Sequence, residues 1–506
     1  MNLKRIFQLL LSSLLSQGVS VITQLLVPPF FLRFYGSGVE VYGEWIALSA
    51  SVNYLSTLNY GIQTYANNEM TILYNRGDVE GAKSVQASAF RLLLLLVLVF
   101  GVVGAVVFFL PIASWLKLRH ESSMAAALTL YLLILQLGVN MLFSLLTNCY
   151  MVVGQLHRGY SWASAQRLFS VLIMAAAIWR RSSFPVLAGI QLGSLLLFMV
   201  LVLIDVRRTS EMLLPSLRYG SWKQVLTILK PSGHFGLIAV AGFLTWQGPV
   251  LLIQRVLGPG AVAVFALIRV VFQMSRQLLM TASTTIAQDI TRLVGQQDWK
   301  QLRRLYDLSE RVVLFLIPVV SIGSLLLCPF LFTVWLHKRD MYNPMLCLLM
   351  AIVSAVLGIK EHKTQFQSSS NEHEKLSVFI LWGYAIMLGV SVFTMHLYGL
   401  PGFILTWLVW EVIQTGFVLR MNDELFPKEM AVSSEPIVRL VLFLTVAFAI
   451  AAVPTWRGVH WPLVTVVSVA VGMSAAFAVA AYFVFGMGEV RELLVSRLRS
   501  RFAPTT

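Results

Sequence analysis

Long apolar segments constrain the fold of this chain more than any other feature of its sequence. Runs of roughly 20–28 mostly apolar residues recur along the chain, and each can cross a hydrocarbon layer of about 30 Å as a helix. Only 12% of the 506 residues are charged, and the mean hydropathy is +0.77. Because soluble globular proteins carry far more charge, we expect an all-α polytopic membrane protein.

The apolar runs predict about fourteen transmembrane helices, arranged as two sets of six and a final pair. The first six lie near 8–32, 43–65, 87–115, 124–152, 160–179 and 184–205. The second six lie near 228–253, 261–288, 308–336, 342–366, 375–396 and 400–420, and the last two near 436–456 and 461–487. The expected domains are an N-terminal six-helix bundle at 1–205, a cytoplasmic linker at 206–227, a C-terminal six-helix bundle at 228–420, a second linker at 421–435, helices 13 and 14 at 436–487 and a basic tail at 488–506.

The distribution of basic residues predicts how the chain is oriented. Its formal net charge is +15, which in a soluble protein would suggest a nucleic-acid partner. Counted by alternate loops, 27 Lys and Arg fall on one side and 9 on the other, while Arg269 and Arg276 fall inside a span. By the positive-inside rule, both termini are expected to be cytoplasmic. The basic character therefore reports orientation in the membrane, and no nucleic-acid partner is expected.

A proline-rich helix end followed by a glycine turn occurs once in each half of the chain. The segment from Pro28 to Gly38 returns about 222 positions later, so that Arg33, Gly36 and Gly38 align with Arg255, Gly258 and Gly260. A polar stretch at 75–80 likewise aligns with 296–301. Since each half has an even number of spans, the halves should be parallel repeats related by a pseudo-twofold axis along the membrane normal.

The eighth predicted span carries a polar stripe at helical spacing. Arg269, Gln273 and Arg276 recur at i, i+4 and i+7, and the same stripe at an offset of 220 in the second span includes Asn53, Ser56 and Gln63. An arginine at mid-bilayer costs at least ~2.5 kcal/mol on insertion scales, so two on one face should line water or bind anions. The two stripes are therefore predicted to face a wet cavity with one basic wall. The alternative is structural pairing of these arginines with an acid.

Three further charged residues, Glu411, Arg33 and Arg255, have alternative interpretations. Glu411 is interpreted as the one acid deep inside a predicted span, where it either binds a coupling ion or is hydrogen-bonded within the bundle. It is also the candidate partner for Arg269 or Arg276. Arg33 and Arg255, at the predicted outer ends of spans, either reach towards lipid headgroups or form an outer gate in which Arg33 meets Glu44 or Glu40.

No metal site or cofactor is expected from the sequence. The His/Glu/Lys groups at 360–363 and 372–375 lack the spacing of metal ligands and are interpreted as a solvated face. Cys149, Cys328 and Cys347 are interpreted as small core residues, because they lie in or near apolar runs and form no CxxC pair. Coupling to protons or sodium ions is left open.

Several short motifs carry a family resemblance. They are Pro28-x-x-x-Leu32-Arg33-x-x-Gly36, Tyr42-Gly43-x-Trp45, Asn59-Tyr60-Gly61 and the run from Gly77 to Ala82. With the fourteen-span layout, they resemble the Wzx-type lipid-linked oligosaccharide flippases of the multidrug/oligosaccharidyl-lipid/polysaccharide exporter superfamily. The resemblance implies alternating-access export of a polyprenyl-diphosphate glycan for polysaccharide biosynthesis, as in O-antigen assembly. Membrane lipid is then a partner, and contact with other polysaccharide-assembly proteins is compatible with this role.

Other function classes fit the sequence less well. A membrane glycosyltransferase or polymerase needs positioned carboxylates or an extramembrane domain, and the longest predicted loop is only about two dozen residues. An ATP-driven pump needs a phosphate-binding loop, but the sequence contains no Gly-Lys pair. The remaining alternative is an ion-coupled multidrug antiporter of the same superfamily. A cationic drug would need acids in the cavity, whereas this sequence supplies arginines, whose fork suits diphosphate.

Overall fold

The computed structural model describes most of the chain in detail. It covers residues 3–53, 76–209, 214–222, 242–284, 297–369, 374–427 and 432–488, with 66–67, 69–71, 73–74, 225, 240, 286, 290, 293–294 and 491–492 between and after them. Within these residues all regular structure is helical, and ten helices are long and apolar enough to cross a membrane. The predicted all-α polytopic fold is therefore confirmed. Helices satisfy their own backbone hydrogen bonds, as an apolar layer requires.

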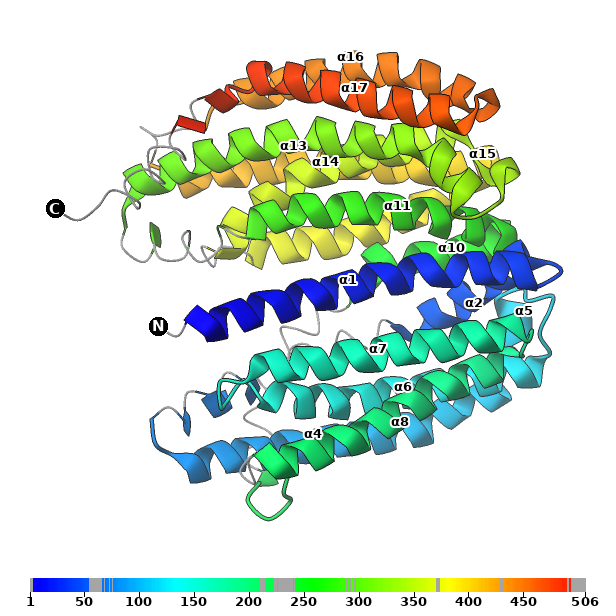
Figure 1. Ribbon diagram of the computed structural model, residues 1–506, viewed down its shortest axis with the longest axis vertical. Coiled ribbons are helices and arrows are strands. Elements are labelled where there is room, and N and C mark those ends of the chain that lie inside the picture. Colours follow the sequence, from blue (N-terminus) through cyan, green and yellow to red (C-terminus); the bar gives the residue numbers. More distant parts are fainter. Residues whose placement is uncertain are drawn as a thin grey trace. The chain divides into compact units, whose positions relative to one another are not determined.

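The chain divides into two compact units, 1–266 and 267–506. In the first unit, α6 (Ser123–Cys149) packs on α8 (Phe184–Thr209) and on α4 (Val79–Gly104), while α7 (Leu156–Trp179) packs on α1 (Leu3–Phe34) (Figure 1). The 3-10 helix η1 (Ala105–Phe109) and the short α5 (Ile112–Trp115) follow α4, and α10 (Gly248–Leu257) packs on α2 (Gly38–Asn53).

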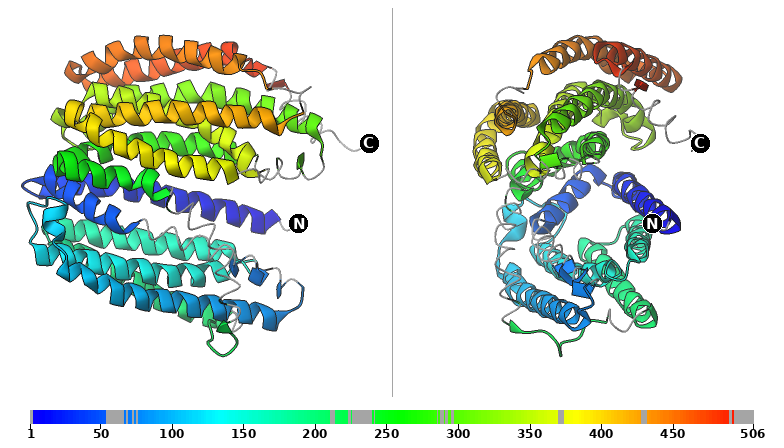
Figure 2. Two further views of the ribbon diagram at one scale, coloured as in Figure 1. Left: turned by 180° about the vertical axis from the view of Figure 1, so that it is seen from behind. Right: turned by 90° about the vertical axis from the view of Figure 1, so that its left-hand side faces the viewer.

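The second unit is built around α14 (Pro344–Ser369). This helix packs against α13 (Trp299–Val334) and α15 (Glu374–Leu425), while α16 (Glu435–Arg457) and α17 (Leu463–Val484) pack on α13 (Figure 2). Short 3-10 helices, η3 (Arg339–Met341) and η5 (Gly458–His460), lie in the connections. The helix α11 (Pro259–Thr284) begins in the first unit and continues in the second. The predicted bundles at 1–205 and 228–420, with the linker at 206–227, stay a prediction.

A glycine turn divides α15 into two arms. This element has 52 residues, far more than one crossing of a bilayer needs. Gly399, with φ 61° and ψ −144°, leaves the helical region and separates the arms 374–398 and 400–425. A positive φ is strained for residues that carry a Cβ, so glycine suits this turn. With the two arms counted separately, a described helix overlaps each of the fourteen predicted spans, and the number of spans stays a prediction.

The internal repeat is visible in the way that α4 and α13 begin. Asp78 and Asp298 are the N-caps, with φ and ψ of −84° and 77° in one and −85° and 74° in the other. Each carboxylate accepts a hydrogen bond from the backbone N–H three residues later, and each cap follows a residue with positive φ, Gly77 or Gln297. The structural offset is therefore 220, whereas the predicted alignment of 75–80 with 296–301 was wrong by one residue.

Tyr42-Gly43-x-Trp45 has a packing role at the start of α2. The Trp45 and Tyr42 rings lie 6.1 and 5.6 Å from the ring of Phe31 on α1, and Trp45 also meets Phe184 on α8. Gly43 lies against the backbone at the start of α11, so closely that a Cβ there would stand 1.8 Å from the carbonyl oxygen of Pro259. The motif therefore sets how closely two helix ends approach within the first unit.

We expect Gly43→Ala to destabilise the protein, because the backbone of Pro259 would have to move. Overpacking of this kind costs typically about 1–3 kcal/mol. Gly36→Ala is the matched control, since a Cβ at Gly36 meets nothing within 4 Å. The thermal unfolding midpoint of each purified variant in detergent measures the effect. Equal midpoints for the two variants would contradict the packing role of Gly43.

Candidate functional site

The predicted polar stripe of the second half lies on α11 within the second unit. Arg269, Gln273 and Arg276 are each partly buried there. Asn53 is the last residue of α2, and the structure does not describe its side chain. Ser56 and Gln63 lie outside the described residues. The prediction that the two stripes face each other concerns the arrangement of the two units and stays a prediction.

Arg276 has a carboxylate partner. Its guanidinium forms an ion pair with Oε1 of Glu361 on α14, and both side chains are 17% exposed. The sequence suggested Glu411 as the partner if such pairing occurred, and Glu411 instead meets Lys360. The ion pair with Glu361 can hold the Arg276 guanidinium in position, and it leaves open whether Arg276 binds a ligand.

Four consecutive residues of α14 each contact a different surrounding group. They are Lys360, Glu361, His362 and Lys363, and we call them the α14 charge cluster. Lys360 donates to Glu411, to the Tyr384 hydroxyl at 2.9 Å and to the Gln414 side-chain oxygen at 2.9 Å, all on α15. The Glu411 carboxylate also accepts hydrogen bonds from Tyr384 and Trp407. The Glu411 carboxylate is therefore fully buried and hydrogen-bonded through both of its oxygens.

The other members of the cluster contact α13. Lys363 forms an ion pair with Glu310 and donates to the Tyr306 hydroxyl at 2.7 Å, while His362 Nε2 lies 2.9 Å from the Ser309 hydroxyl. The exposed fractions of Lys360, His362 and Lys363 are 7%, 1% and 1%. The interpretation of 360–363 as a solvated face was therefore wrong.

Helix geometry explains why neighbouring residues contact different helices. Successive side chains point about 100° apart around a helix, so four in a row sample the whole circumference. α14 packs against α13, α15 and α16, and its Glu361 reaches Arg276 on α11. Buried charges there need partners. The sequence contained one usable signal: Lys360, Lys363 and Gln367 share a helix face, as do Glu411 and Gln414. Glu310 and Glu44 are buried as well, near the ends of their predicted spans.

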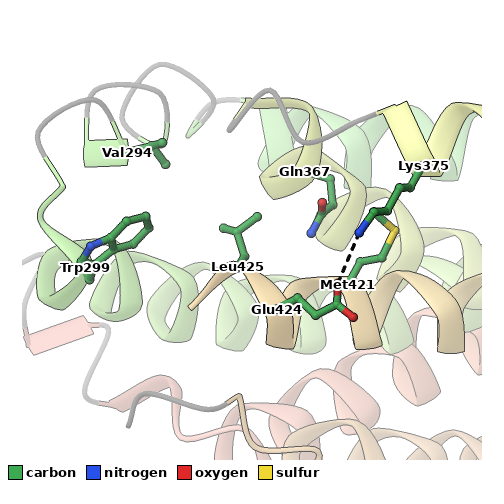
Figure 3. A pocket seen from close by; sticks show the side chains of 7 residues that line it. All are labelled: Val294, Trp299, Gln367, Lys375, Met421, Glu424 and Leu425. Carbon is green, nitrogen blue, oxygen red and sulfur yellow. Dashed lines mark ion pairs between the residues drawn. The ribbon is translucent and has the colours of Figure 1, made fainter. Parts of the chain in front are cut away.

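A cavity of about 320 Å³ lies at the end of this network (Figure 3). The side chains that line it are Val294, Trp299, Gln367, Lys375, Met421, Glu424 and Leu425. Lys375 and Glu424 face each other across 4.0 Å, and both are largely exposed. Gln367 donates to Asn422 at 2.6 Å, and Asn422 donates to the carbonyl oxygen of Lys363 at 3.1 Å. The cavity is thus linked to the α14 charge cluster through side-chain amides.

A third arginine lies midway along a membrane-spanning helix, and the sequence analysis missed it. Arg167 is exposed near the middle of α7 in the first unit. The loop count had assigned this residue to a cytoplasmic connection, although it falls within the predicted span 160–179. An exposed arginine at this depth costs free energy against lipid, so it belongs among the candidate functional residues.

The proposed outer gate residues do not form the predicted pair. Glu44 is buried and accepts a hydrogen bond from the Arg119 N–H at 2.6 Å, and its carboxylate lies 3.2 Å from His120 Nδ1. Arg33 is exposed with its guanidinium 5.7 Å from the Phe34 ring, and Arg255 is exposed as well. Among the described contacts none joins Arg33 to Glu44 or Glu40, so both arginines fit headgroup contacts at least as well.

Two groups beside this gate region have raised pKa values. Burial raises the pKa of the Glu121 carboxyl, and the nearby Glu44 carboxylate raises it further. The hydrogen bond that the Phe184 N–H donates to Glu121 lowers this pKa. Burial, with the charge of Glu121, raises the pKa of Tyr35 to about 12. Tyr35 donates to the Ser182 carbonyl oxygen. These contacts hold the ends of α1, α6 and α8 together.

We expect Lys360→Met to destabilise the second unit, because Glu411 would remain buried without a cation. Loss of one partner from a buried pair costs about 3–5 kcal/mol. Lys360→Met combined with Glu411→Gln should recover part of the loss. Lys375→Met is the control, since its pair with Glu424 is exposed and long. Thermal unfolding of the purified variants tests this, and an unchanged midpoint for Lys360→Met would refute it.

Comparisons with known proteins place this fold. No family model matches the sequence, and no curated protein matches it. The structure of the lipid II flippase MurJ in an inward closed conformation is similar, with a TM-score of 0.71, 13% identity and coverage of 96% of this chain and 100% of that one. An inward-facing multidrug resistance MATE family transporter of the MOP superfamily gives 0.62, 14% identity and coverage of 80% and 94%. An outward-facing structure with the same description gives 0.54, 14% identity and coverage of 82% and 93%.

These similarities concern the fold, because all three identities are low. They agree with the helical layout of the two units and with a second unit that continues into α16 and α17. The two MATE structures are described as members of the MOP superfamily, which is the superfamily that the sequence motifs resemble. The chain therefore has the multi-pass helical fold that these three transporter structures share.

Proposed function

We propose that this protein is an alternating-access flippase of the bacterial inner membrane. It takes a polyprenyl-diphosphate-linked oligosaccharide from the cytoplasmic leaflet and releases it in the outer leaflet for polysaccharide biosynthesis. Its termini lie in the cytoplasm. The observation that carries this proposal is the pair of arginines, Arg269 and Arg276, on one face of a membrane-spanning helix in a MOP-superfamily fold. The similarity to both inward- and outward-facing transporters supports alternating access.

The cations on one face of α11 favour an anionic ligand. Arg269 and Arg276 lie seven residues apart on that face. A guanidinium binds phosphate oxygens in a bidentate fork, which suits diphosphate better than an ammonium does. Arg269 and Arg276 therefore bind the diphosphate, and Gln273 between them can hydrogen-bond a phosphate or a sugar.

The polyprenyl tail needs an apolar path along the protein. A groove of about 750 Å³ lies between α16 and α17 and is lined almost entirely by apolar side chains. They are Thr445, Val446, Ala449, Ile450, Val453, Pro454, Trp461, Val469 and Met473. Val446, Ile450 and Val453 are about half exposed, so the groove is open to an acyl or isoprenoid chain in the bilayer. We place the tail there while the diphosphate and sugars cross.

The runner-up is an ion-coupled multidrug antiporter of the same superfamily. A transported cation would need a buried acid available to it. In the described part of the second unit, Glu310, Glu361 and Glu411 each already have a cationic partner. That arrangement favours the flippase. Glu411 stays a candidate for ion coupling only if its pair with Lys360 opens during transport.

We expect Arg269→Ala and Arg276→Ala to abolish glycan export at normal protein abundance, while Lys at either position restores export partly. Alanine removes the charge, whereas lysine keeps it and loses the fork. Each charge-assisted hydrogen bond contributes about 1.5–3 kcal/mol, so one loss weakens binding roughly ten- to a hundredfold. Export and membrane abundance are measured together in cells that depend on the protein. Arg167→Ala, measured alongside, should also lower export.

The structural alternative for Arg276 predicts a different result. If the arginine serves only to neutralise Glu361, Arg276→Ala should lower protein abundance, and adding Glu361→Gln should restore abundance and export together. Combination with Glu411→Gln should then have no such effect, because Glu411 pairs with Lys360. Normal export by both alanine variants at normal abundance would refute the anion site.

Cysteine labelling tests the proposed orientation. The native Cys149, Cys328 and Cys347 are buried and can be replaced first. Cysteines at the exposed Glu80 and Lys300 should react with an impermeant thiol reagent only from the cytoplasm, and one at Ser37 only from outside. The distribution of 27 and 9 basic residues is the basis of this expectation. The reverse pattern of labelling would overturn the topology.

A further inference from the structure

Three ion pairs lie among α11, α13, α14 and α15, and they differ in burial. The side chains of Lys360 and Glu411 are 9% and 0% exposed, and those of Lys363 and Glu310 are 1% and 6% exposed. Those of Arg276 and Glu361 are both 17% exposed. The pair that includes the candidate substrate-binding arginine is therefore the one most open to exchange with a ligand.

The pairs also differ in how fully their carboxylates are hydrogen-bonded. Glu411 uses both oxygens: Oε2 accepts from Lys360, and Oε1 accepts from Tyr384 at 2.5 Å and from Trp407 at 2.9 Å. Glu361 accepts from Arg276 through Oε1, whereas its Oε2 is buried without a hydrogen-bond partner in the described part of the chain. A carboxylate with one hydrogen-bonded oxygen is displaced more easily than a carboxylate that accepts hydrogen bonds through both oxygens.

We propose that Glu361 is an internal anion that occupies the Arg276 guanidinium when no substrate is bound, and that the phosphate groups of the substrate displace it. This inference rests on the proposed function, in which Arg276 binds the diphosphate. It assigns Glu361 a role in setting affinity and selecting the ligand. The more deeply buried Lys360–Glu411 and Lys363–Glu310 pairs hold the helices together.

Competition with Glu361 makes the site selective for ligands with more than one negative charge. A monoanion that replaces the Glu361 carboxylate gives the Arg276 guanidinium one negative charge in place of another, so the interaction gains nothing. A diphosphate brings more charge and can also reach Arg269, which lies seven residues before Arg276 on the same helix face. When the diphosphate leaves, Glu361 returns, so the empty protein does not bury an unpaired guanidinium.

The displaced carboxylate gives the competition a pH dependence with a definite sign. The charged groups around Glu361 are Arg276 on α11, Lys360 on its own helix and Glu411 on α15. On the α13 side, Lys363 and Glu310 pair with each other. When Arg276 turns to the ligand, Glu361 loses its counter-charge and its protonated form is favoured. Binding then takes up a proton, and by linkage a lower pH strengthens binding.

Binding of farnesyl diphosphate to the purified full-length protein in detergent tests the proposal. Calorimetric titrations at several pH values between about 6 and 8 compare the native protein with variants. We expect Glu361→Gln to bind about tenfold more tightly, as typical coupling between sites would give. The affinity of Glu361→Gln should change less with pH than the affinity of the native protein does. The ratio of its affinities for farnesyl diphosphate and farnesyl monophosphate should also be smaller than in the native protein. Glu424→Gln, which removes an exposed acid of the same unit, is the control and should leave all three unchanged.

The outcomes separate this inference from the function on which it rests. Equal binding by native protein and Arg276→Ala would refute both. Weak binding by Arg276→Ala with unchanged or weaker binding by Glu361→Gln would leave the diphosphate site standing and overturn the role of Glu361. Should Glu361→Gln not fold, Glu361→Asp keeps the charge with a shorter reach and should still tighten binding. Infrared difference spectra of the native protein need no variant: a new carboxylic acid C=O band on ligand addition supports the proposal, and its absence overturns it.

Discussion

Charge inside an apolar helix bundle must be paired, and the second unit is organised by that requirement. Moving an ion out of water costs roughly several kcal/mol of solvation free energy, even after the protein relaxes around it. The α14 charge cluster meets this cost by sending Lys360 to α15, Glu361 to α11 and Lys363 to α13. Each pair fixes the rotation of one neighbouring helix against α14. The same contacts that allow charge to be buried therefore set the position of Arg276.

Much of the fold follows from sequence because the membrane leaves so few choices. A chain inside lipid must satisfy its backbone hydrogen bonds internally and therefore forms helices, so the apolar runs predict where the helices lie in the sequence. They also predict the break near Gly399 between the two arms of α15. The repeat was likewise readable, although its register near Asp298 needed the N-cap geometry to be set correctly. The predicted stripe on α11 depends only on helical spacing and is placed by the helix itself.

The partners of the charges could not be read in the same way. Glu361 is 85 positions from Arg276, and Glu411 is 51 from Lys360, so both pairings depend on how α14 is rotated and how deep it lies. Residues at 360–363 come near the end of an apolar run, where charge usually marks the start of a loop. The helix instead continues to Ser369 and keeps them inside. Burial of a lysine is a tertiary property, and hydropathy alone assigns it to solvent.

A protein that handles an anion must keep cations in an apolar layer when the anion is absent. Arg276 is largely enclosed, and the Glu361 carboxylate beside it neutralises its charge. An internal carboxylate lowers the cost of the empty state, and for the same reason it weakens the hold on any ligand. For the proposed flippase, which must release what it binds, this loss of affinity favours turnover, and it gives a physical reason for an acid beside Arg276, the proposed diphosphate-binding residue.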